Sequence, residues 1–445
     1  MILQTLDPTP IGESLTRLET LVSEHTGVVR SVRRHLATTD DARLVSVACE
    51  LADASDLIGV DVDARAIAWA PCSRTATAAA IGEAAERYSA SWLPAGLVLA
   101  SADELGSAAV DPRRFALFSR DQYESPGFPC RPFSRETRLR WARGTSLPDG
   151  APAWLPAQLV YLTGLPPAAG ETPIGYATSS GLACGPTLEE ALANALLEVV
   201  ERDAFMLTWH SRLSLPVVDL DGDAQLDRFL ERYVRPTGLR VSAVDLSAFH
   251  DIPTVLALVR GDRRDDVALT VGASAAPRAS DACIKAFGEA FACRAWARLL
   301  LASRPDRRFD PDFTDIADFE DHVHLYALHE HAAKAGFLDR SRERRALGDL
   351  PRLPGETAAA RISAIAERLA RSRATAYAVD VTAPDVREAG LHVVRVIVPE
   401  LCQLDLFHRG RFLGGTRLYE AAWQLGLRDG PLSPDEINPD PHPFP

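Results

Sequence analysis

The chain has 445 residues, of which 47% are hydrophobic and 24% charged, and its formal net charge at pH 7 is −13. This composition is typical of a folded globular protein and excludes a disordered chain, while the negative charge argues against nucleic acid as a partner, because such binding depends on neutralised phosphates. We find neither a signal peptide nor an apolar run of roughly 18 residues, so we expect a cytoplasmic protein with no membrane partner.

The first part of the chain predicts a short extension, a strand pair and a helix. We assign residues 1–20 to an N-terminal extension, and residues 28–51 alternate between apolar and polar positions as two strands would. Small residues at helical spacing predict a helix over residues 75–92. Between residues 126 and 167, many prolines, glycines and aromatics without a helical period predict irregular hairpins.

A second helix is predicted from Thr187 onwards, in the run TLEEALANALLEVVERDAFMLTW. Thr187 and Glu190 have the spacing of a capping box, and an apolar stripe follows them. The loop just before this helix, TSSGLACG, offers glycines and hydroxyls at a helix N-terminus, where backbone N–H groups favour anions. By itself such a loop is weak evidence for a phosphate site.

The second half of the chain mixes strands and helices. Residues 239–245, 255–260 and 267–273 are predicted strands, Ser280 is the expected cap of a helix that runs to Leu301, and the sequences ATAYAVDVT and LHVVRVIVPEL predict two more buried strands. The arginine-rich residues 341–373 suggest one solvated surface helix. We therefore expect an α+β fold with mixed, mostly antiparallel sheets packed with helices, rather than a doubly wound parallel sheet.

Two pairs of glutamates share the spacing E-x-x-E-R. Glu83 and Glu86 form one pair and Glu198 and Glu201 the other, and at three residues apart on a helix the carboxylates lie on one face, about 5 to 6 Å apart at Cβ. Both helices are apolar or alanine-rich, so the carboxylates need a partner, and oxygen ligands suit Mg²⁺ shared with substrate phosphates. Glu289 in a third helix could add another ligand. The residues alone leave open that these are salt-bridged or solvated helix faces.

Other chemistries find less support. A di-iron bundle needs E-x-x-H, which neither pair offers. The histidines of DHVHLYALHEH, residues 321–331, contain no i, i+4 pair, so we interpret this stretch as a polar linker helix. The seven cysteines are scattered singly without zinc spacing, and G-x-S-x-G is missing, so neither a zinc site nor a hydrolase is indicated.

Taken in order, GEAAERYS, ATSSGLACGPTLEEALANALLEVVERDAF, the helix around Glu289, DVTAPDV and the terminal NPDPHPFP resemble YcaO domains, from about residue 21 to residue 445. The P-x-P-x-P ending resembles azoline-forming members of the family. The resemblance implies a YcaO-type fold, ATP and Mg²⁺ as cofactors, and Arg202 as a phosphate contact. The implied metal ligands are Glu83, Glu86, Glu198, Glu201 and Glu289. The implied nucleotide contacts are Arg74, Glu83, Ser180, Glu198, Arg202 and Glu289.

Four positions depart from the family pattern. Arg74 stands where lysine is common, Ser180 where asparagine is frequent, Ala292 where glutamine is frequent, and Glu400 in place of a glycine. These changes leave open whether the nucleotide contacts are tuned or the activity is weakened.

The resemblance also implies a reaction. A Cys, Ser or Thr side chain of a ribosomally made precursor peptide attacks the preceding amide carbonyl, the resulting oxyanion takes the γ-phosphoryl group of ATP, and phosphate leaves to give a thiazoline or (methyl)oxazoline. Arg202 would stabilise the transferring group. We divide the chain into residues 1–20, a catalytic domain at 21–430 and a proline-rich tail at 431–445 that places the carboxylate of Pro445 near the reacting amide as a proton acceptor.

Partners follow from the same resemblance. We expect the precursor peptide, a separate protein that grips its leader, a flavin-dependent azoline dehydrogenase, and a homodimer of this chain. Two alternatives stay open: a thioamide-forming YcaO that uses the same ATP site with external sulfide, and a catalytically weak scaffold that binds nucleotide within a peptide-modifying complex.

Overall fold

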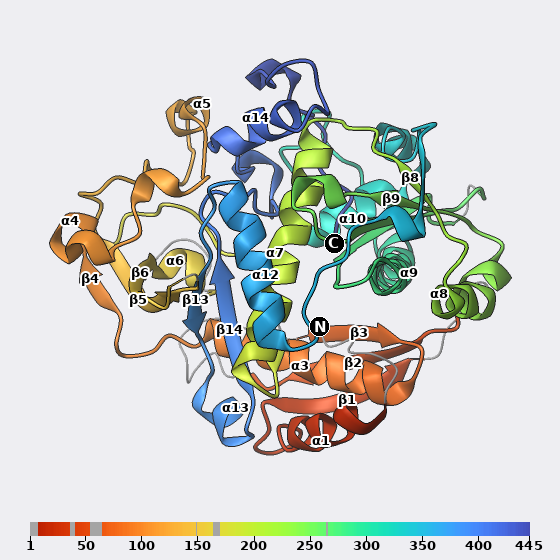
Figure 1. Cartoon of the computed structure of the whole chain (residues 1–445), viewed down its shortest axis with the longest axis horizontal. Helices are drawn as coiled ribbons and strands as arrows, with labels where there is room; N and C mark the ends of the chain where they lie inside the picture. Colours follow the sequence, from red (N-terminus) through yellow and green to blue (C-terminus); the bar gives the residue numbers. More distant parts are fainter. Residues whose placement is uncertain (1–7, 36–40, 54–64, 148, 163–169, 264–265) are drawn as a thin grey trace.

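Three β-sheets packed with helices make up the computed structural model, which describes residues 8–35, 41–53, 65–147, 149–162, 170–263 and 266–445 (Figure 1). Among these residues all pairs of named strands are antiparallel except β8 with β12. The predicted α+β class with mixed, mostly antiparallel sheets is therefore confirmed.

The first sheet lies under an alanine-rich helix. Its strands are β1 (Val29–His35), β2 (Val45–Leu51) and β3 (Arg65–Ala70), and its helices are α1 (Pro8–Glu19) and α3 (Ser73–Ser91). Val47 and Cys49 bury one face of β2, as the alternation predicts. Ala76, Ala80 and Ala84 are fully buried, and their small side chains let α3 lie close to β2 and β3. The predicted strand pair and helix are both present.

The second sheet brings together segments that are far apart in the sequence. Its order is β4-β5-β13-β14-β7, with β6 paired to β5. The strands are β4 (Val98–Ala100), β5 (Leu139–Ser146), β6 (Pro152–Pro156), β7 (Leu182–Gly185), β13 (Tyr377–Asp380) and β14 (His392–Ile397). The β5–β6 hairpin falls in the predicted hairpin region, whose residues 148 and 163–169 lie outside the described residues. The pairing of Cys184 with Val393 places the loop before β7 beside β14.

The third sheet has the order β11-β10-β9-β8-β12 and is covered by α9 (Ala279–Ser303). Its strands are β8 (Val217–Asp219), β9 (Arg240–Asp245), β10 (Thr254–Arg260), β11 (Leu269–Ala275) and β12 (Arg344–Ala346). The expected capping role of Ser280 is wrong, because α9 begins one residue earlier and Arg278 is the N-cap residue, without a side-chain cap bond. Gly272 lets α9 approach β11, since a Cβ there would lie 2.5 Å from the backbone of Ala286.

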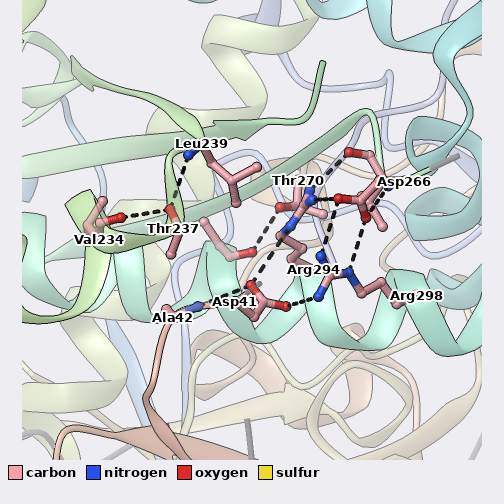
Figure 2. Close-up of polar contacts among 11 residues, drawn as sticks. Asp41, Ala42, Val234, Thr237, Leu239, Asp266, Thr270, Arg294 and Arg298 are labelled. Atoms are coloured by element: carbon pink, nitrogen blue, oxygen red, sulfur yellow. Dashed lines mark hydrogen bonds and ion pairs between the residues drawn. The ribbon is translucent and has the colours of Figure 1, made fainter. Parts of the chain in front are cut away.

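A buried ion network ties α9 to the N-terminal part of the chain (Figure 2). Arg294 is fully buried, donates to the carbonyl of Val267 at 2.9 Å and pairs with Asp266. The neighbouring Arg298 reaches Asp41 at 2.9 Å and Asp266 at 3.1 Å. Two arginines thus share two carboxylates, an arrangement that keeps buried charges paired. The network holds α9 in place about one turn beyond Glu289.

Helix α7 (Leu188–His210) passes between the second and third sheets, against β7, β14 and β11 (Figure 1). The hydroxyl of Thr187 accepts a hydrogen bond from the N–H of Glu190 at 3.2 Å, so the predicted helix start is confirmed. The run from Phe205 to Trp209 is buried, so the second half of α7 has apolar residues on more than one face because it is surrounded by other elements.

The remaining helices are short or cover the sheets. They are α4 (Ala102–Leu105), α5 (Arg120–Glu124), α6 (Ala157–Val160), α8 (Ala224–Phe229), α10 (Phe319–Ala327), α11 (His329–Ala332), α12 (Ala358–Arg371), α13 (Pro384–Glu388) and α14 (Thr416–Gln424). Helix α12 is only half solvated, because Ile365 and Leu369 are buried where it packs on α7. The interpretation of residues 321–331 as a polar linker was wrong, since His322 and His324 are each 1% exposed.

The end of the chain lies inside the molecule. In Figure 1 its mark falls near the centre of the view, and Ile437 and Phe444 belong to the same hydrophobic cluster as Phe205 and Trp209 of α7. The described helices include none that is long and apolar enough to cross a lipid bilayer.

Candidate active site

Helix α3 carries the first pair of predicted carboxylates. Glu86 is buried, and its Oε1 accepts a hydrogen bond from the backbone N–H of Cys184 in β7 at 2.7 Å. Glu83 is half-buried and forms an ion pair with Arg87, with 2.9 Å between Oε1 and Nη2. Of the two, Glu86 is thus the one held in the interior.

The second pair lies on α7 with Arg202 beside it. The Oε2 of Glu201 accepts from the backbone N–H of Ala275 at 3.2 Å, at the end of β11. Its Oε1 has no hydrogen-bond donor among the described residues, although Nη1 of Arg202 lies 3.3 Å away. The Nη2 of Arg202 donates to Glu198 at 3.3 Å. One guanidinium therefore serves two carboxylates.

Glu289 joins them from α9. A Cβ on Gly272 would lie 2.6 Å from the Cβ of Glu289, so this part of α9 lies directly over β11. Burial, and next the charge of Glu201, raise the pKa of Glu289 well above its ordinary value. Glu201 of α7 is thus near enough for its charge to act on Glu289 of α9.

We call Glu86, Glu198, Glu201, Arg202 and Glu289 the carboxylate centre. Burial raises the pKa of Glu86 and of Glu201 to about 7. Leaving water disfavours the charged form of a carboxyl group, and in this centre Glu198 and Glu201 share the guanidinium of Arg202. Even with Lys285 and Arg395 nearby, the four carboxylates outnumber the cations, and a divalent cation with oxygen ligands would supply the missing positive charge.

The fit to a metal rests on this deficit and on Oε1 of Glu201, which accepts no hydrogen bond from a described residue and is met only by the 3.3 Å ion pair with Arg202. In the part of the chain that the structure describes, no three His, Cys, Asp or Glu side chains are gathered closely enough to hold one ion. A cation would have to draw carboxylates from α3, α7 and α9 together. The assignment of Glu83, Glu86, Glu198, Glu201 and Glu289 as ligands stays a prediction.

Ser180 lies in the turn that leads into β7. Its backbone N–H donates to the hydroxyl of Thr178 at 3.3 Å, and the two hydroxyls are 3.1 Å apart. Gly181 has φ of +82°, and a Cβ there would lie 2.4 Å from the carbonyl oxygen of Val396. The glycine is thus required both by its conformation and by the close approach of β14. The same turn lies against the middle of α7, because a Cβ on Gly181 would lie 2.9 Å from Cγ2 of Val199.

Arg74 and Glu400 also depart from the family pattern, and the structure shows where each side chain lies. Arg74 is exposed in the first turn of α3, so its predicted nucleotide contact stays a prediction. Glu400 pairs with Arg114 and accepts from the backbone N–H of Thr375 at 3.3 Å, so it has a structural partner of its own. Nothing in the structure explains Ala292.

The sequence reasoning missed two cations. Lys285 lies one turn before Glu289 on α9 and is half-buried, and no hydrogen bond or ion pair joins its ammonium group to a described residue. Burial lowers its pKa, and Glu289 and Glu201 are among the charges that oppose this shift. The chain has only two lysines, Lys285 and Lys334, against 46 arginines, from 48 basic side chains in all. Because lysine and arginine are not interchangeable, that scarcity was a usable signal.

Arg395 of β14 is the other missed cation. It is fully buried and donates to the carbonyls of Thr178 and Leu159, so it fixes the turn that holds Ser180. Burial lowers the pKa of Arg395 to about 10, and Glu198 acts in the opposite direction. A lone arginine in a strand gives no signal in the sequence, because only the fold brings it under this turn.

The tail reaches the carboxylate centre. The guanidinium of Arg202 lies over the ring of Phe444, 4.3 Å from its centroid, and the ring of Phe205 lies 4.8 Å from that of Phe444. Pro445 is half-exposed at the end of this contact. The structure therefore brings Phe444 to Arg202, while a contact from Pro445 to a reacting group stays a prediction.

A separate polar cleft of about 630 Å³ opens between β8 and β9. Arg260 and Asp339, which pair at 2.8 Å, form part of its wall. None of the residues that we predicted for the site lines it.

A family model described as YcaO cyclodehydratase, ATP- and Mg²⁺-binding, matches residues 72–402. This range includes α3, α7 and α9 with all the predicted carboxylates. The chain belongs to the YcaO family.

Solved structures with the YcaO fold agree. A heterocyclase in complex with substrate and cofactor has a TM-score of 0.80 and 24% identity over 98% of this chain and 57% of that chain. YcaO from Methanopyrus kandleri, bound with AMPPCP and Mg²⁺, has a TM-score of 0.63 and 18% identity, over 89% of this chain and 92% of that chain. A chain of the E. coli microcin synthetase McbBCD complex with pro-MccB17 bound has a TM-score of 0.58 and 15% identity, over 85% of this chain and 90% of that chain. At these identities the likeness establishes the fold.

The YcaO chain spans about half the length of some relatives. It covers 57% of the heterocyclase and 43% of an uncharacterized protein in the tfuA 3′ region of Rhizobium leguminosarum bv. trifolii, which is 31% identical over 194 residues, or 42% of this chain.

Proposed function

We propose that this YcaO chain is an ATP-dependent cyclodehydratase that converts Cys, Ser or Thr residues of a ribosomally made peptide to thiazoline or (methyl)oxazoline. The observation that carries the proposal is the contact between two parts that the reaction needs. Arg202 of the carboxylate centre pairs with Glu198 and lies over Phe444 of the tail. The proposed phosphate site and the proline-rich tail therefore share Arg202.

The proposed reaction is balanced by ATP. The substrate thiol or hydroxyl loses its proton to solvent and forms a bond to the preceding carbonyl carbon. The resulting oxyanion takes the γ-phosphoryl group with release of ADP, and phosphate leaves as the amide proton is lost and a C=N bond forms. Mg²⁺, when bound, would neutralise phosphate charge. Its proposed ligands are the carboxylates of the carboxylate centre together with Glu83. The use of ATP and Mg²⁺ is supported by the M. kandleri YcaO structure, which is bound with AMPPCP and Mg²⁺.

The chain's own cations have separate tasks. Arg202 and Lys285 would bind the phosphate oxygens, where preorganised charge stabilises phosphoryl transfer. Arg395 would hold the turn with Ser180 in position, and Arg74 would add a contact from the start of α3. The carboxylate of Pro445 would accept the amide proton, since the tail already ends beside Arg202.

We also propose the division into residues 1–20, 21–430 and 431–445, and a separate partner that delivers the peptide. Support for a partner comes from McbBCD, a YcaO-fold structure that is a complex and has pro-MccB17 bound. An azoline dehydrogenase and a homodimer remain part of the proposal.

The test is phosphate release with a precursor peptide encoded beside this chain and its partner protein. Loss of one water mass from the peptide, at one phosphate released per ring, is the expected result. Replacement of oxygen by sulfur would assign the chain to thioamide formation instead, and no turnover with any partner would leave a scaffold.

A further inference from the structure

The polar cleft between β8 and β9 is an opening within the third sheet. Its wall includes residues 217–221, which contain β8, and residues 240–243 of β9. Strand β9 pairs with β10 along its whole length, but among the described residues it pairs with β8 only at Val217–Val244. Beyond that pair β8 keeps its register with β12. The two strands therefore diverge, and we call the space between residues 217–221 and 240–243 the strand gap.

The backbone of β9 turns hydrogen-bonding groups into the strand gap. The N–H of Asp245 donates to the carbonyl of Pro216 at 2.9 Å, so the backbone of Asp245 faces β8. Alternate residues of a strand direct their N–H and C=O groups to the same neighbour, so Ala243 and Val241 also face β8. No described strand pairs with Val241 on that side. The N–H and C=O of Val241 thus form an open edge.

Strand β8 supplies the opposite edge of the strand gap. The N–H of Val217 donates to the carbonyl of Glu343 at 3.0 Å, in the direction of β12. By the same alternation the backbone of Val218 faces β9. A peptide that adds to a sheet as a strand gains main-chain hydrogen bonds from such edges. The opening therefore fits a polypeptide segment in extended conformation.

The charged side chains of the strand gap leave one cation without a partner. Asp339 accepts two hydrogen bonds from Arg260, at 2.8 and 2.9 Å, and one from Ser242 at 3.0 Å, so this part of the wall is fixed and neutral. Arg344 of β12 also lines the cleft, is exposed and forms no ion pair with a described residue. Asp219 is exposed in the wall as well. Arg344 can therefore take a carboxylate from a ligand.

The strand gap lies away from the carboxylate centre. Ala275, whose N–H donates to Glu201, pairs with Thr254 at the end of the sheet where Asp245 lies. Val241 is about 14 Å further along β9 and about 10 Å across two strands from β11. The straight distance from Ala275 to Val241 is thus roughly 17 Å, which about five extended residues would span.

We propose that the strand gap binds a segment of the peptide substrate as an added strand between β8 and β9, with an acidic side chain of that segment on Arg344. The segment is separated by at least about five residues from the residue that reacts. The inference rests on the proposed function, because it needs a peptide substrate. It gives the chain a hold on its substrate that does not involve the reacting residue.

Peptide binding is measured on the full chain without ATP. The probe is a short fluorescein-labelled peptide of alternating valine and glutamine with one central glutamate, which has no Cys, Ser or Thr to cyclise. Its anisotropy should rise on titration with the chain. Val241→Pro removes the N–H that faces the strand gap and should weaken binding at least about 10-fold. Val241→Ala is the matched control and should bind the probe normally.

A proline at position 241 is compatible with the sheet, because the N–H of Val241 does not face β10. Circular dichroism of each variant checks this.

Arg344→Gln tests the proposed ion pair. With the natural chain, replacing the glutamate of the probe by glutamine should weaken binding about 3-fold, the scale of an exposed ion pair. With Arg344→Gln the two probes should bind equally. Arg342→Gln is the control, because Arg342 is exposed two residues away and does not line the cleft, so the difference between the probes should persist. If Val241→Pro does not fold, this comparison decides.

Turnover tests whether the ligand is the substrate. With the precursor peptide encoded beside this chain, Val241→Pro should raise the KM for the peptide about 10-fold and leave kcat and MgATP affinity unchanged. An unchanged KM would overturn the proposal, and weaker probe binding in that variant would then assign the strand gap to another protein.

The proposal would also fail if a folded natural chain did not bind the probe at millimolar concentration, or if both probes bound equally to it. Intact probe binding without any turnover would contradict the proposed reaction and not the strand gap, so the two failures are distinguishable.

Discussion

The carboxylate centre and the tail groove, which we define as the side chains of Trp209, His322, Tyr326, Lys334, Asp405 and Arg411 around residues 438–444, are neighbours that share α7, yet their hydrogen-bond partners differ. In the centre, Glu201 has an oxygen without a hydrogen bond and burial raises its pKa to about 7. In the tail groove, Trp209, Tyr326 and His322 each donate to a carbonyl of the tail. Buried polar groups are normally satisfied. The donors in the tail groove are thus satisfied by carbonyls of the same chain, whereas the centre has a buried carboxylate oxygen to which no described residue donates.

The largest expected effect comes from breaking the centre. Glu201→Gln removes an anionic oxygen at a buried site and should lower turnover by about 1,000-fold, in the range seen when one electrostatic group is removed from a phosphoryl or acyl transfer site. Its melting temperature should not fall, because the substitution also removes a buried charge. Peptide-stimulated phosphate release and thermal unfolding measure the two effects.

Glu189→Gln is the matched control, since Glu189 is exposed in the first turn of the same helix. An unaffected rate in Glu201→Gln would show that the carboxylate centre is not the site.

A second prediction separates the two regions. Deleting Phe444 and Pro445 should lower azoline formation by about 100-fold, the scale of a lost proton acceptor, and leave ATP binding intact. The deletion spares the contacts of Asp440 and Pro441 in the tail groove. Calorimetric titration with MgATP and mass analysis of the peptide distinguish these effects. Loss of ATP affinity with intact folding would show that the tail contributes to the nucleotide site.

Lys285 tests whether the centre extends along α9. Lys285→Met should raise the KM for ATP about 10-fold with little change in kcat, because a charged hydrogen bond to phosphate is lost in both the ground state and the transition state. Steady-state kinetics at saturating peptide measure it. Lys285→Arg keeps the charge and should recover part of the affinity, and an unchanged KM in Lys285→Met would remove Lys285 from the site.

The smallest effect concerns acid stability beside the tail groove. Burial, and next Arg411, lower the pKa of His408 from 6.5 to about 3, with His322 and His210 adding to the shift. The unfolded chain takes up this proton near pH 6.5 and the folded chain only near pH 3. The contribution of His408 is therefore full above pH 6.5 and declines below it, by up to about 1.4 kcal/mol per pH unit.

His408→Asn should flatten that decline in urea unfolding measured at pH 7, 6 and 5. His25→Asn provides the comparison, because His25 is exposed. An equal slope in both variants would show that His408 is not held neutral by its surroundings.

Sequence reasoning succeeded where the signal is local. A few neighbouring residues were enough to predict several elements: the alternation of residues 28–51 indicated strands, and the alanines of α3 and the Thr187 cap of α7 indicated helices. The spacing of the glutamates placed them on helices. It failed where the answer depends on what packs against a segment. The charges of α12 predicted a solvated helix, but one of its faces packs against α7. The histidines of residues 321–331 predicted a polar linker, but His322 contacts the tail in the interior.

The same limit applies to the site. Four of the five carboxylates were found because the two pairs repeat one motif, and Glu289 was added from the family resemblance. Arg395 and the donors of the tail groove come from separate elements that meet only in the fold. Lys285 could have been found from the sequence, because lysine is rare in this chain and Lys285 lies four residues before Glu289, but the sequence analysis did not consider it.

The scarcity of lysine gives the molecule a built-in pair of chemical reporters. Apart from the α-amino group, acylating reagents find only the ε-amines of Lys285 and Lys334, and each lies in one of the two regions compared above. Covalent labelling followed by peptide mass analysis can therefore report on the proposed nucleotide site through Lys285 and on the tail contact through Lys334 in the same sample.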